Sequence, residues 1–482
     1  MLEKLFKLSE NKTTVRTEII AGVTTFMTMA YIMFVNPNIL GTPGTGMDKG
    51  AIFVATVLGA GIVTIAMGLL VNYPIALAPG MGLNAFYTYT VILGMGVKWQ
   101  VALGAVFISG LIFILLTLTK VREMIVDAIP KSLKFAITAG IGLFIAFIGL
   151  KDGGIIISNQ ATFVGLGHVL SDPSALFAII GLLITGILMA KRIKGAILIG
   201  VLATALLGII PTAVPIFKAD ADVVKTAQVS ADKNKTSVIE ELKKVDFNYY
   251  QKNDQFYKGV TPLPTGISSF VSAPPSIAPT FLKLDIMGAL KLGFLNILLT
   301  FTFVELFDTL GTLVGTLSRA GLQDKEGKFP RIGRAMLVDA TGVSFGALLG
   351  TSTLTAYIES GAGVEEGGRT GLTAVTVGVL FLASLFIAPT AGLITAAATA
   401  PALILVGVLM ASSLKNIEWD DITEAIPAFL ITVGMPLTFS IANGIAAGLI
   451  TYTVLKVFTG KASKVHPIIY ILTLLFFVRG FI

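Results

Sequence analysis

Four acidic side chains lie inside long apolar stretches of the sequence: Glu305, Asp308, Asp339 and Glu359. An ionised carboxylate at the centre of a bilayer costs roughly 2.5–3.5 kcal/mol on insertion scales, so such groups normally persist only where they have a function. No Lys or Arg is expected at mid-membrane to pair with them. We therefore expect each carboxylate to be protonated, hydrated in a cavity, or bound to a ligand that donates hydrogen bonds.

Glu305 and Asp308 lie three residues apart, which places them on one face of a helix. Thr302, Thr309 and Thr312 continue that face. Two neighbouring carboxylates do not readily ionise together, so one of them should hold a proton near neutral pH. The pair then offers one donor and one acceptor, which suits both a heterocyclic ligand and proton coupling. The alternative is a structural role, in which this polar face only holds the helix against its neighbours.

Glu359 follows an extended stretch, 351–356, and lies near the start of a short helix. Free backbone N–H groups and the positive end of the helix dipole are expected at the same spot. A carboxylate there can accept N–H groups of a ligand, although capping of the helix would also explain it. Asn84 is the counterpart in the first half, and its amide offers both a donor and an acceptor. Asn in a membrane span also commonly joins helices.

Asp339 lies in the middle of a later apolar stretch, and we interpret it as a network partner of the Glu305 region. A purely structural role explains it equally well. Phe26, Phe86 and Tyr357 are candidates for stacking on a flat ligand, although aromatic residues are also common on core and lipid faces. Glu305 and Asp339 are the candidate residues for proton coupling.

The composition decides what kind of protein carries these residues. Hydrophobic residues make up 54% and charged residues only 13%, with a mean hydropathy of +0.87. Soluble domains carry roughly 25% charged residues, so a soluble enzyme is excluded. The absence of Cys excludes disulfides, thiolate metal sites and Cys nucleophiles, and two His residues make a His-based site unexpected. We therefore expect no catalytic residue, cofactor or metal. The net charge of +7 reflects where the loops lie relative to the membrane, so we expect no nucleic-acid partner either.

Fourteen apolar segments approach the roughly 20 residues that a helix needs to cross a bilayer. They are expected at 17–40, 51–71, 74–94, 100–119, 132–150, 173–190, 195–217, 286–316, 331–350, 351–370, 371–390, 394–413, 422–440 and 441–458. Residues 1–16 lack the apolar region of a signal peptide and are expected in the cytoplasm. The apolar segment 465–482 either spans the membrane or lies in its interface.

The distribution of Lys and Arg favours an inner N-terminus, because the expected outer loops hold only Lys49, Lys98 and Lys151. The polar segment 218–280 is then an external loop between two sets of seven spans. Since seven is odd, the second set must be inverted relative to the first. The third and tenth segments both begin as a short extended stretch and continue into a Gly-rich helix start. Paired, interrupted half-helices in inverted repeats are typical of a transporter binding site, although Gly and Pro could merely kink packed helices.

Four separated segments, 18–37, 78–86, 307–312 and 358–364, resemble hallmarks of the AzgA-like purine permeases. This family is a branch of the nucleobase:cation symporter-2 superfamily. The resemblance implies an all-α polytopic fold of seven-plus-seven inverted repeats. It also implies a core domain, 17–120 with 281–390, and a gate domain, 121–217 with 391–464.

The same resemblance implies a multi-pass plasma-membrane permease that imports adenine, guanine or hypoxanthine by proton symport with elevator-type movement. By matching motifs, Asn84, Asp308 and Glu359 would contact the base, and Glu305 would support binding or coupling. It leaves a homodimer open as the oligomeric state. The alternatives are an anion carrier of the same architecture, which the carboxylates disfavour, a membrane enzyme, which lacks a nucleophile and base, and a channel.

Overall fold

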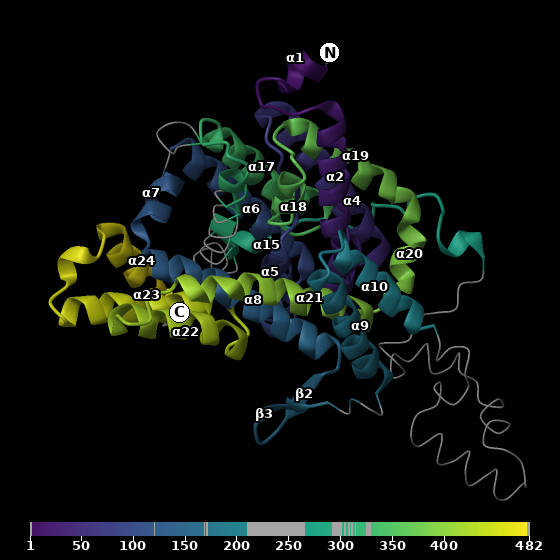
Figure 1. Ribbon diagram of the computed structural model, residues 1–482. Coiled ribbons are helices and arrows are strands. Elements are labelled where there is room, and N and C mark those ends of the chain that lie inside the picture. Colours follow the sequence, from purple (N-terminus) through teal and green to yellow (C-terminus); the bar gives the residue numbers. More distant parts are fainter. Residues whose placement is uncertain are drawn as a thin grey trace, which may run out of the picture. The chain divides into compact units, whose positions relative to one another are not determined.

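The computed structural model describes residues 2–119, 121–167, 169, 172–209, 266–291, 301–302, 305–306, 309, 312–313, 315–323 and 329–479 (Figure 1). The chain divides into two compact units. The first comprises Met1–Phe147, Ala273–Ala388 and Val406–Ile482, and the second comprises Ile148–Ser272 and Pro389–Leu405. Most of the segment 218–280 and Asp308 lie outside the described residues. The division into core and gate domains stays a prediction.

Long apolar helices dominate the described part of the chain, and eight of them are long and apolar enough to cross a membrane. The helices of the first half include α1 (Leu2–Phe6), α2 (Val15–Met29), α3 (Ile32–Leu40), α4 (Lys49–Ala66), α6 (Trp99–Leu118), α7 (Val121–Ala128) and α8 (Lys131–Asp152). Those of the second half include α15 (Ile286–Lys291), α17 (Ile332–Leu349), α19 (Gly371–Ala383), α20 (Ala388–Leu393), α21 (Ala396–Ala411), α22 (Ile422–Leu437), α23 (Ile441–Phe458) and α24 (Pro467–Arg479). A multi-pass membrane protein is thus confirmed.

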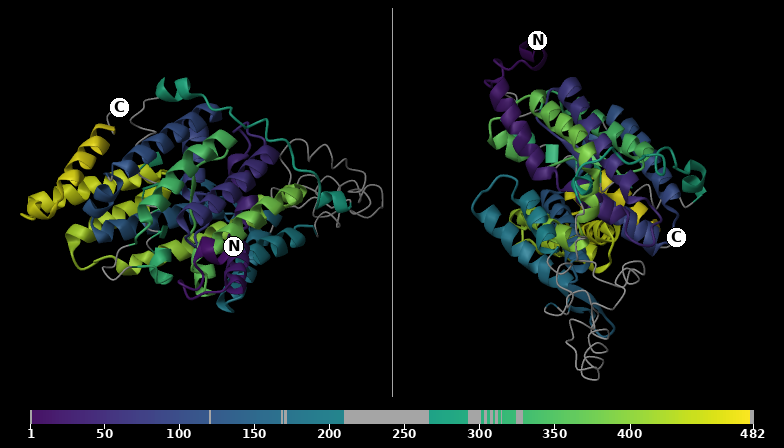
Figure 2. Two further views of the ribbon diagram at one scale, coloured as in Figure 1. Left: turned by 90° about the horizontal axis from the view of Figure 1, so that it is seen from above. Right: turned by 90° about the vertical axis from the view of Figure 1, so that its right-hand side faces the viewer.

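The first apolar segment forms two consecutive helices rather than one. Thr14 caps α2 by accepting a hydrogen bond from the backbone N–H of Thr17 at 3.2 Å. The helix then breaks at Ala30 and Tyr31, and α3 continues with Pro37 inside it. Helix α19 packs against both α2 and α4 (Figures 1 and 2).

The third and tenth segments each consist of a short strand followed by a short helix. Strand β1 (Leu77–Pro79) precedes α5 (Met81–Ala85) and the π-helix η2 (Phe86–Gly94). Strand β4 (Leu354–Ala356) precedes α18 (Ser360–Glu365). The strands pair antiparallel, and Ala78 faces Thr355 in the register. The predicted all-α class therefore needs this two-stranded pair added to it.

Neighbouring groups hold the paired strands in the protein interior. The backbone N–H of Gly80 donates to the carbonyl of Thr353 at 3.0 Å, and the N–H of Tyr357 donates to that of Ala76 at 2.9 Å. Gly350 ends α17 with a φ of +92°, and a Cβ there would collide with Thr280. Glycine adopts this left-handed conformation without strain, so the chain can turn sharply from α17 into the segment that leads to β4.

The second unit contains α9 (Pro173–Ala190), α10 (Ala196–Leu207) and the hairpin strands β2 (Ile156–Asn159) and β3 (Phe163–Leu166). Helices α9 and α10 pack against each other. Ile155, Ala178, Ala400 and Ile404 form its buried hydrophobic cluster. The last two residues come from the second half of the sequence, so both halves of the chain build this unit.

Helices α22 and α23 are linked by buried charges. Lys456 on α23 is buried, with its Nζ 2.8 Å from Glu424 Oε1 and 2.7 Å from Thr423 Oγ1. Asp421 caps α22 and also binds Lys461 at 3.2 Å. Hydrogen bonds from the Thr423 hydroxyl and backbone, with the nearby Lys side chains, hold the pKa of Asp421 well below its usual value. The cluster fixes this end of the helical hairpin.

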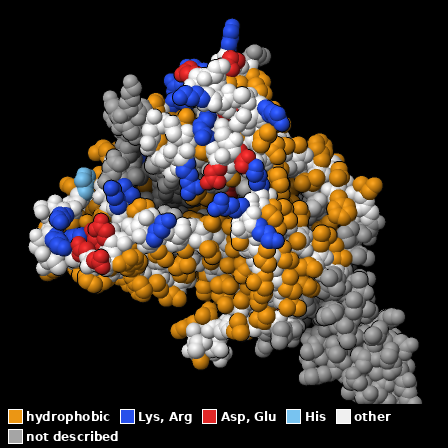
Figure 3. All heavy atoms as spheres, in the orientation of Figure 1, with side chains coloured by type: hydrophobic (Ala, Val, Ile, Leu, Met, Phe, Trp, Pro, Cys, Tyr) orange, Lys and Arg blue, Asp and Glu red, His pale blue; other side chains and the backbone are white. Residues whose placement is uncertain are grey.

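The surface agrees with a membrane location. Lys and Arg side chains gather over the end at which α1 lies, whereas hydrophobic side chains cover the side on which α19 lies (Figure 3). Among the exposed hydrophobic side chains are Val379 on α19 and Phe386 just after it, at 53% and 55% exposure. Helix α24 has 13 residues, which gives a length of about 20 Å. That is shorter than the roughly 30 Å hydrocarbon core, so the described helix is too short to span it upright.

Candidate functional site

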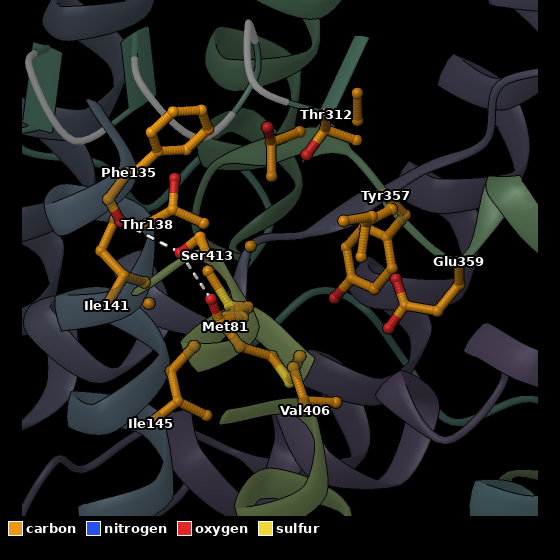
Figure 4. Close-up of a pocket in the computed structure, with 16 residues that line it drawn as sticks. Met81, Phe135, Thr138, Ile141, Ile145, Thr312, Tyr357, Glu359, Val406 and Ser413 are labelled. Atoms are coloured by element: carbon orange, nitrogen blue, oxygen red, sulfur yellow. Dashed lines mark hydrogen bonds between the residues drawn. The ribbon is translucent and has the colours of Figure 1, made fainter. Parts of the chain in front are cut away.

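A cavity of about 220 Å³ lies in the first unit beside the paired strands (Figure 4). Five parts of the chain supply its walls: the β1–α5 turn, helix α8, Thr312, the β4–α18 segment, and helix α21 with the residues that follow it. The lining residues are Gly80, Met81, Gly82, Phe135, Thr138, Ile141, Ile145, Thr312, Thr355, Ala356, Tyr357, Ile358, Glu359, Val406, Met410 and Ser413. Most are apolar, and a few polar groups face the space, which is the usual make-up of a small-molecule site.

Glu359 supplies the carboxylate of this cavity. The buried Tyr31 hydroxyl donates to Glu359 Oε1 at 2.6 Å. The Glu359 side chain makes no capping hydrogen bond to α18. The N–H groups of Ser360 and Gly361 donate to the carbonyls of Tyr357 and Ile358, respectively. These backbone N–H groups, which were expected to be free for a ligand, are therefore used within the turn. A carboxylate held from one side in a largely apolar cavity is suited to accept N–H groups of a ligand.

Tyr357 lines the cavity next to Glu359 and is fixed at its far end. Its hydroxyl donates to the carbonyl of Pro79 at 2.6 Å, which ties the β4 segment to β1. Figure 4 shows its ring and the Glu359 carboxylate on one side of the cavity, with Phe135, Thr138 and Ile141 of α8 on the other. A flat ligand between these walls would meet an aromatic ring, a carboxylate and apolar side chains.

A second group of polar side chains lies behind β4. The Thr309 hydroxyl is 2.9 Å from Thr355 Oγ1, which belongs to a residue that lines the cavity. The same hydroxyl lies 2.9 Å from Asp339 Oδ2 and 3.3 Å from Glu305 Oε1. Thr309 therefore contacts both Glu305 and Asp339.

The expectation that no Lys or Arg pairs with the buried carboxylates is wrong. Arg122 Nη2 lies 3.1 Å from Asp339 Oδ2, and both side chains are completely buried. Arg122 lies on α7, between the expected spans 100–119 and 132–150. Its partner is 217 positions away in the sequence. Nothing in the local pattern distinguishes it from a loop residue.

Glu18 is a further buried carboxylate that the sequence did not single out. It accepts hydrogen bonds from the backbone N–H of Arg369 at 2.9 Å and from the Thr373 hydroxyl at 2.6 Å. The N–H groups of Thr370 and Thr373 also donate to it. These donors surround the start of α19, so Glu18 secures that helix end to α2.

The structure brings only some of the predicted ligand residues to the cavity. Glu359 and Tyr357 line it, whereas Asp308 lies outside the described residues. The buried Asn84 is not among the residues that line the cavity. Its amide instead donates to Asn36 Oδ1 at 2.7 Å and accepts from the Ser352 hydroxyl. Edge-to-face contacts join Phe26 to Phe381 and Phe86 to Phe301, each pair with ring centroids 5.2 Å apart.

Tyr31 and the α8 wall are the parts of the site that sequence reasoning missed. Tyr31 lies in a continuous apolar run, and its partner Glu359 is 328 positions away. The α8 residues belong to an ordinary hydrophobic span whose cavity-facing side has no distinguishing polar pattern. Within the described ranges, no group of three or more Asp, Glu or His residues could hold a metal ion.

Comparison with known proteins places these features in a family context. The family described as the permease family matches residues 16–447. A putative permease of Methanocaldococcus jannaschii is 51% identical over 99% of this chain and 98% of its own length. The adenine permease AdeP of Escherichia coli is 44% identical over 99% of this chain and 96% of its own. The guanine/hypoxanthine permease PbuG of Bacillus subtilis is 43% identical over 98% of both chains.

The fold also matches a solved structure. The transmembrane domain of the cyanobacterium bicarbonate transporter BicA superposes with a TM-score of 0.60. The alignment covers 90% of this chain and 97% of that domain, at 15% sequence identity. This likeness confirms the predicted class of a seven-plus-seven inverted-repeat membrane protein, and it bears on the fold alone.

Proposed function

The chain belongs to the permease family, and from that premise we propose that it imports a purine nucleobase by proton symport with elevator-type alternating access. The relatives AdeP and PbuG, named for adenine and for guanine and hypoxanthine, align over nearly the whole chain and support this substrate class. The observation that carries the proposal is the Glu359 carboxylate in a mostly apolar cavity, held by Tyr31 beside the Tyr357 ring.

Each chemical feature of a purine would meet a matching group in this cavity. A ring N–H would donate to the Glu359 carboxylate, and the bicyclic face would lie against the Tyr357 ring and the apolar side chains of α8. Asp308 is proposed as a second acceptor on the strength of the family resemblance. Asn84, Phe26 and Phe86 would act from behind the cavity wall, through the packing of the segments that form it.

The predicted domain division is compatible with alternating access at this site. Gly80 and Thr355 belong to the proposed core segments, whereas Ile141 and Met410 belong to the proposed gate segments, and all four line the cavity. Movement of the core against the gate would therefore open the cavity to one side of the membrane or the other.

An anion carrier of the same architecture is less compatible with the cavity. Among the described residues that line it, Glu359 is charged and none is Lys or Arg. An anion would meet the Glu359 carboxylate between mostly apolar walls, where like charges repel more strongly than in water. The likeness to a bicarbonate transporter does not carry its substrate over to this chain.

Competition for uptake tests the substrate class. Hypoxanthine labelled with tritium should accumulate in proteoliposomes, and unlabelled adenine or guanine should compete at low concentration. Uracil should compete poorly, since each buried polar group that it leaves unpaired costs about 1–3 kcal/mol. Nucleosides should fail because the ribose would prevent closure. Better competition by uracil, sulfate or bicarbonate would overturn the assignment.

Proton coupling makes a separate prediction about pH. Glu305 and Asp339 lie in one buried network, so a proton should enter it together with the base. Initial uptake should increase as the external pH falls, and a protonophore should abolish accumulation while leaving binding intact. Uptake that depends on a sodium gradient and resists the protonophore would contradict the proposal.

A further inference from the structure

Arg122 is a fully buried cation whose surroundings fix its position. Its Nη2 lies 3.1 Å from Asp339 Oδ2, and its Nη1 donates to the Met336 carbonyl at 3.3 Å. The guanidinium carbon lies 4.3 Å from the centre of the Phe113 ring. Because Arg stays protonated in proteins, its burial requires a permanent anion close by.

The groups around Asp339 show which charge it carries. Arg122, the Thr309 hydroxyl and the backbone N–H of Ala356 all lie within hydrogen-bonding distance of its carboxylate, the last at 3.3 Å. All three are donors, so together they match an ionised carboxylate rather than a protonated one.

Few other charges face Asp339 from the helices packed around it. Glu305 is linked to Asp339 through the Thr309 hydroxyl, which contacts both carboxyl groups. Helix α6 packs against α17 and contains no charged residue, and α4 carries only Lys49, at its first position. In the described part of the chain, Arg122 is therefore the cation that compensates Asp339.

The single hydrogen of the Thr309 hydroxyl then decides the state of Glu305. Thr309 Oγ1 has Asp339, Glu305 and Thr355 within reach, at 2.9, 3.3 and 2.9 Å. When this hydroxyl donates to the Asp339 anion, its oxygen can only accept from the other two. A contact between Thr309 Oγ1 and Glu305 Oε1 is then favourable only if Glu305 carries the hydrogen.

We propose that Arg122 is the positioning residue for proton coupling: it holds Asp339 as a fixed anion and thereby leaves Glu305 as the carrier of the transported proton. The proposal rests on the proposed function and replaces the expectation that Glu305 and Asp339 share the coupling role. It also links coupling to the site, because Asp339 holds the N–H of Ala356 in the strand that leads to Tyr357 and Glu359.

The test combines uptake with base binding in four purified variants: R122Q, R122K, R122Q/D339N and E305Q. At about pH 7.5, uptake by R122Q should fall more than about tenfold, because Asp339 is left as a buried uncompensated charge. Part of it should return as the pH is lowered, because burial without a compensating cation favours protonation of Asp339, which removes that charge. R122K keeps the cation and should keep the pH profile of the wild type at a lower rate.

The double variant separates the two carboxylates. R122Q/D339N removes both charges and keeps Glu305, so it should bind the base and retain pH-dependent uptake. E305Q should bind and exchange the base at a rate that no longer varies with pH. A wild-type pH profile in R122Q, or loss of the pH dependence in R122Q/D339N despite normal binding, would overturn the proposal. Failure of both the single and the double Arg122 variants to fold would assign the pair a structural role and overturn it as well.

Infrared spectroscopy makes the charge assignment testable without any transported substrate. In the substrate-free wild type near neutral pH, the C=O band of a protonated carboxyl group should disappear in E305Q and persist in R122Q/D339N. The opposite pattern would place the proton on Asp339. If the wild type neither binds nor accumulates purines, the proposed function fails, whereas this band still reports on the role of Arg122.

Discussion

Replacing Glu359 by Gln is expected to abolish accumulation of the base while the protein still reaches the membrane. The substitution preserves size but places an amide where Tyr31 and the ligand both need an acceptor. A hydrogen bond to a charged group is worth about 1.5–3 kcal/mol, and a buried ligand N–H left without an acceptor costs a similar amount. The initial rate of uptake at low substrate concentration should therefore fall by at least roughly a hundredfold.

Two matched variants show whether this loss is specific to the cavity. Glu365 lies six residues further along on the same segment, with a side chain 72% exposed, so E365Q should transport normally. Tyr31→Phe keeps the carboxylate but removes its donor, and it should give an intermediate loss through poorer orientation of Glu359. Wild-type uptake by E359Q, with equal surface expression, would remove Glu359 from the binding site.

The sequence predicted those features that depend on local composition. Apolar segments of sufficient length predicted the spans Lys49–Val71, Trp99–Leu118, Lys131–Asp152 and Gly371–Leu393 to within a few residues, because burial in lipid requires a continuous apolar helix. Glu359 was identifiable because a carboxylate in such a segment is costly. The extended stretches before α5 and α18 were also foreseen, although their pairing and register as β1 and β4 were not.

The features that escaped prediction depend on partners far away in the sequence. Arg122 and Tyr31 are ordinary residues in their own segments, and each gains its significance only from the acidic side chain that the fold brings to it. The roles of Phe26 and Phe86 were ambiguous for a related reason. Aromatic residues suit a ligand site and a packed core equally well, and both rings contact another Phe ring in the structure.

Asn84→Ala is expected to lower the stability of the protein more than its affinity for the base. The Asn84 amide donates to Asn36 Oδ1 at 2.7 Å and accepts from the Ser352 hydroxyl, and all three residues are buried. Truncation leaves two buried polar partners unsatisfied, at about 1–3 kcal/mol each. The thermal unfolding midpoint of the detergent-solubilised variant should fall clearly, and saturating base should restore only part of the loss.

Asn36→Ala is the control that distinguishes a structural role of Asn84 from direct contact with the base. Asn36 belongs to the same network, donating to Thr56 Oγ1 at 2.7 Å and to Thr351 Oγ1 at 2.8 Å, and it does not line the cavity. If the network fixes the segment that leads into β4, both variants should destabilise the protein and weaken base binding in parallel. A variant at Asn84 that raises the KM at an unchanged unfolding midpoint, while Asn36→Ala destabilises, would instead show that Asn84 reaches the base itself. That outcome would require the α5 segment to turn its side chain into the cavity when the substrate binds.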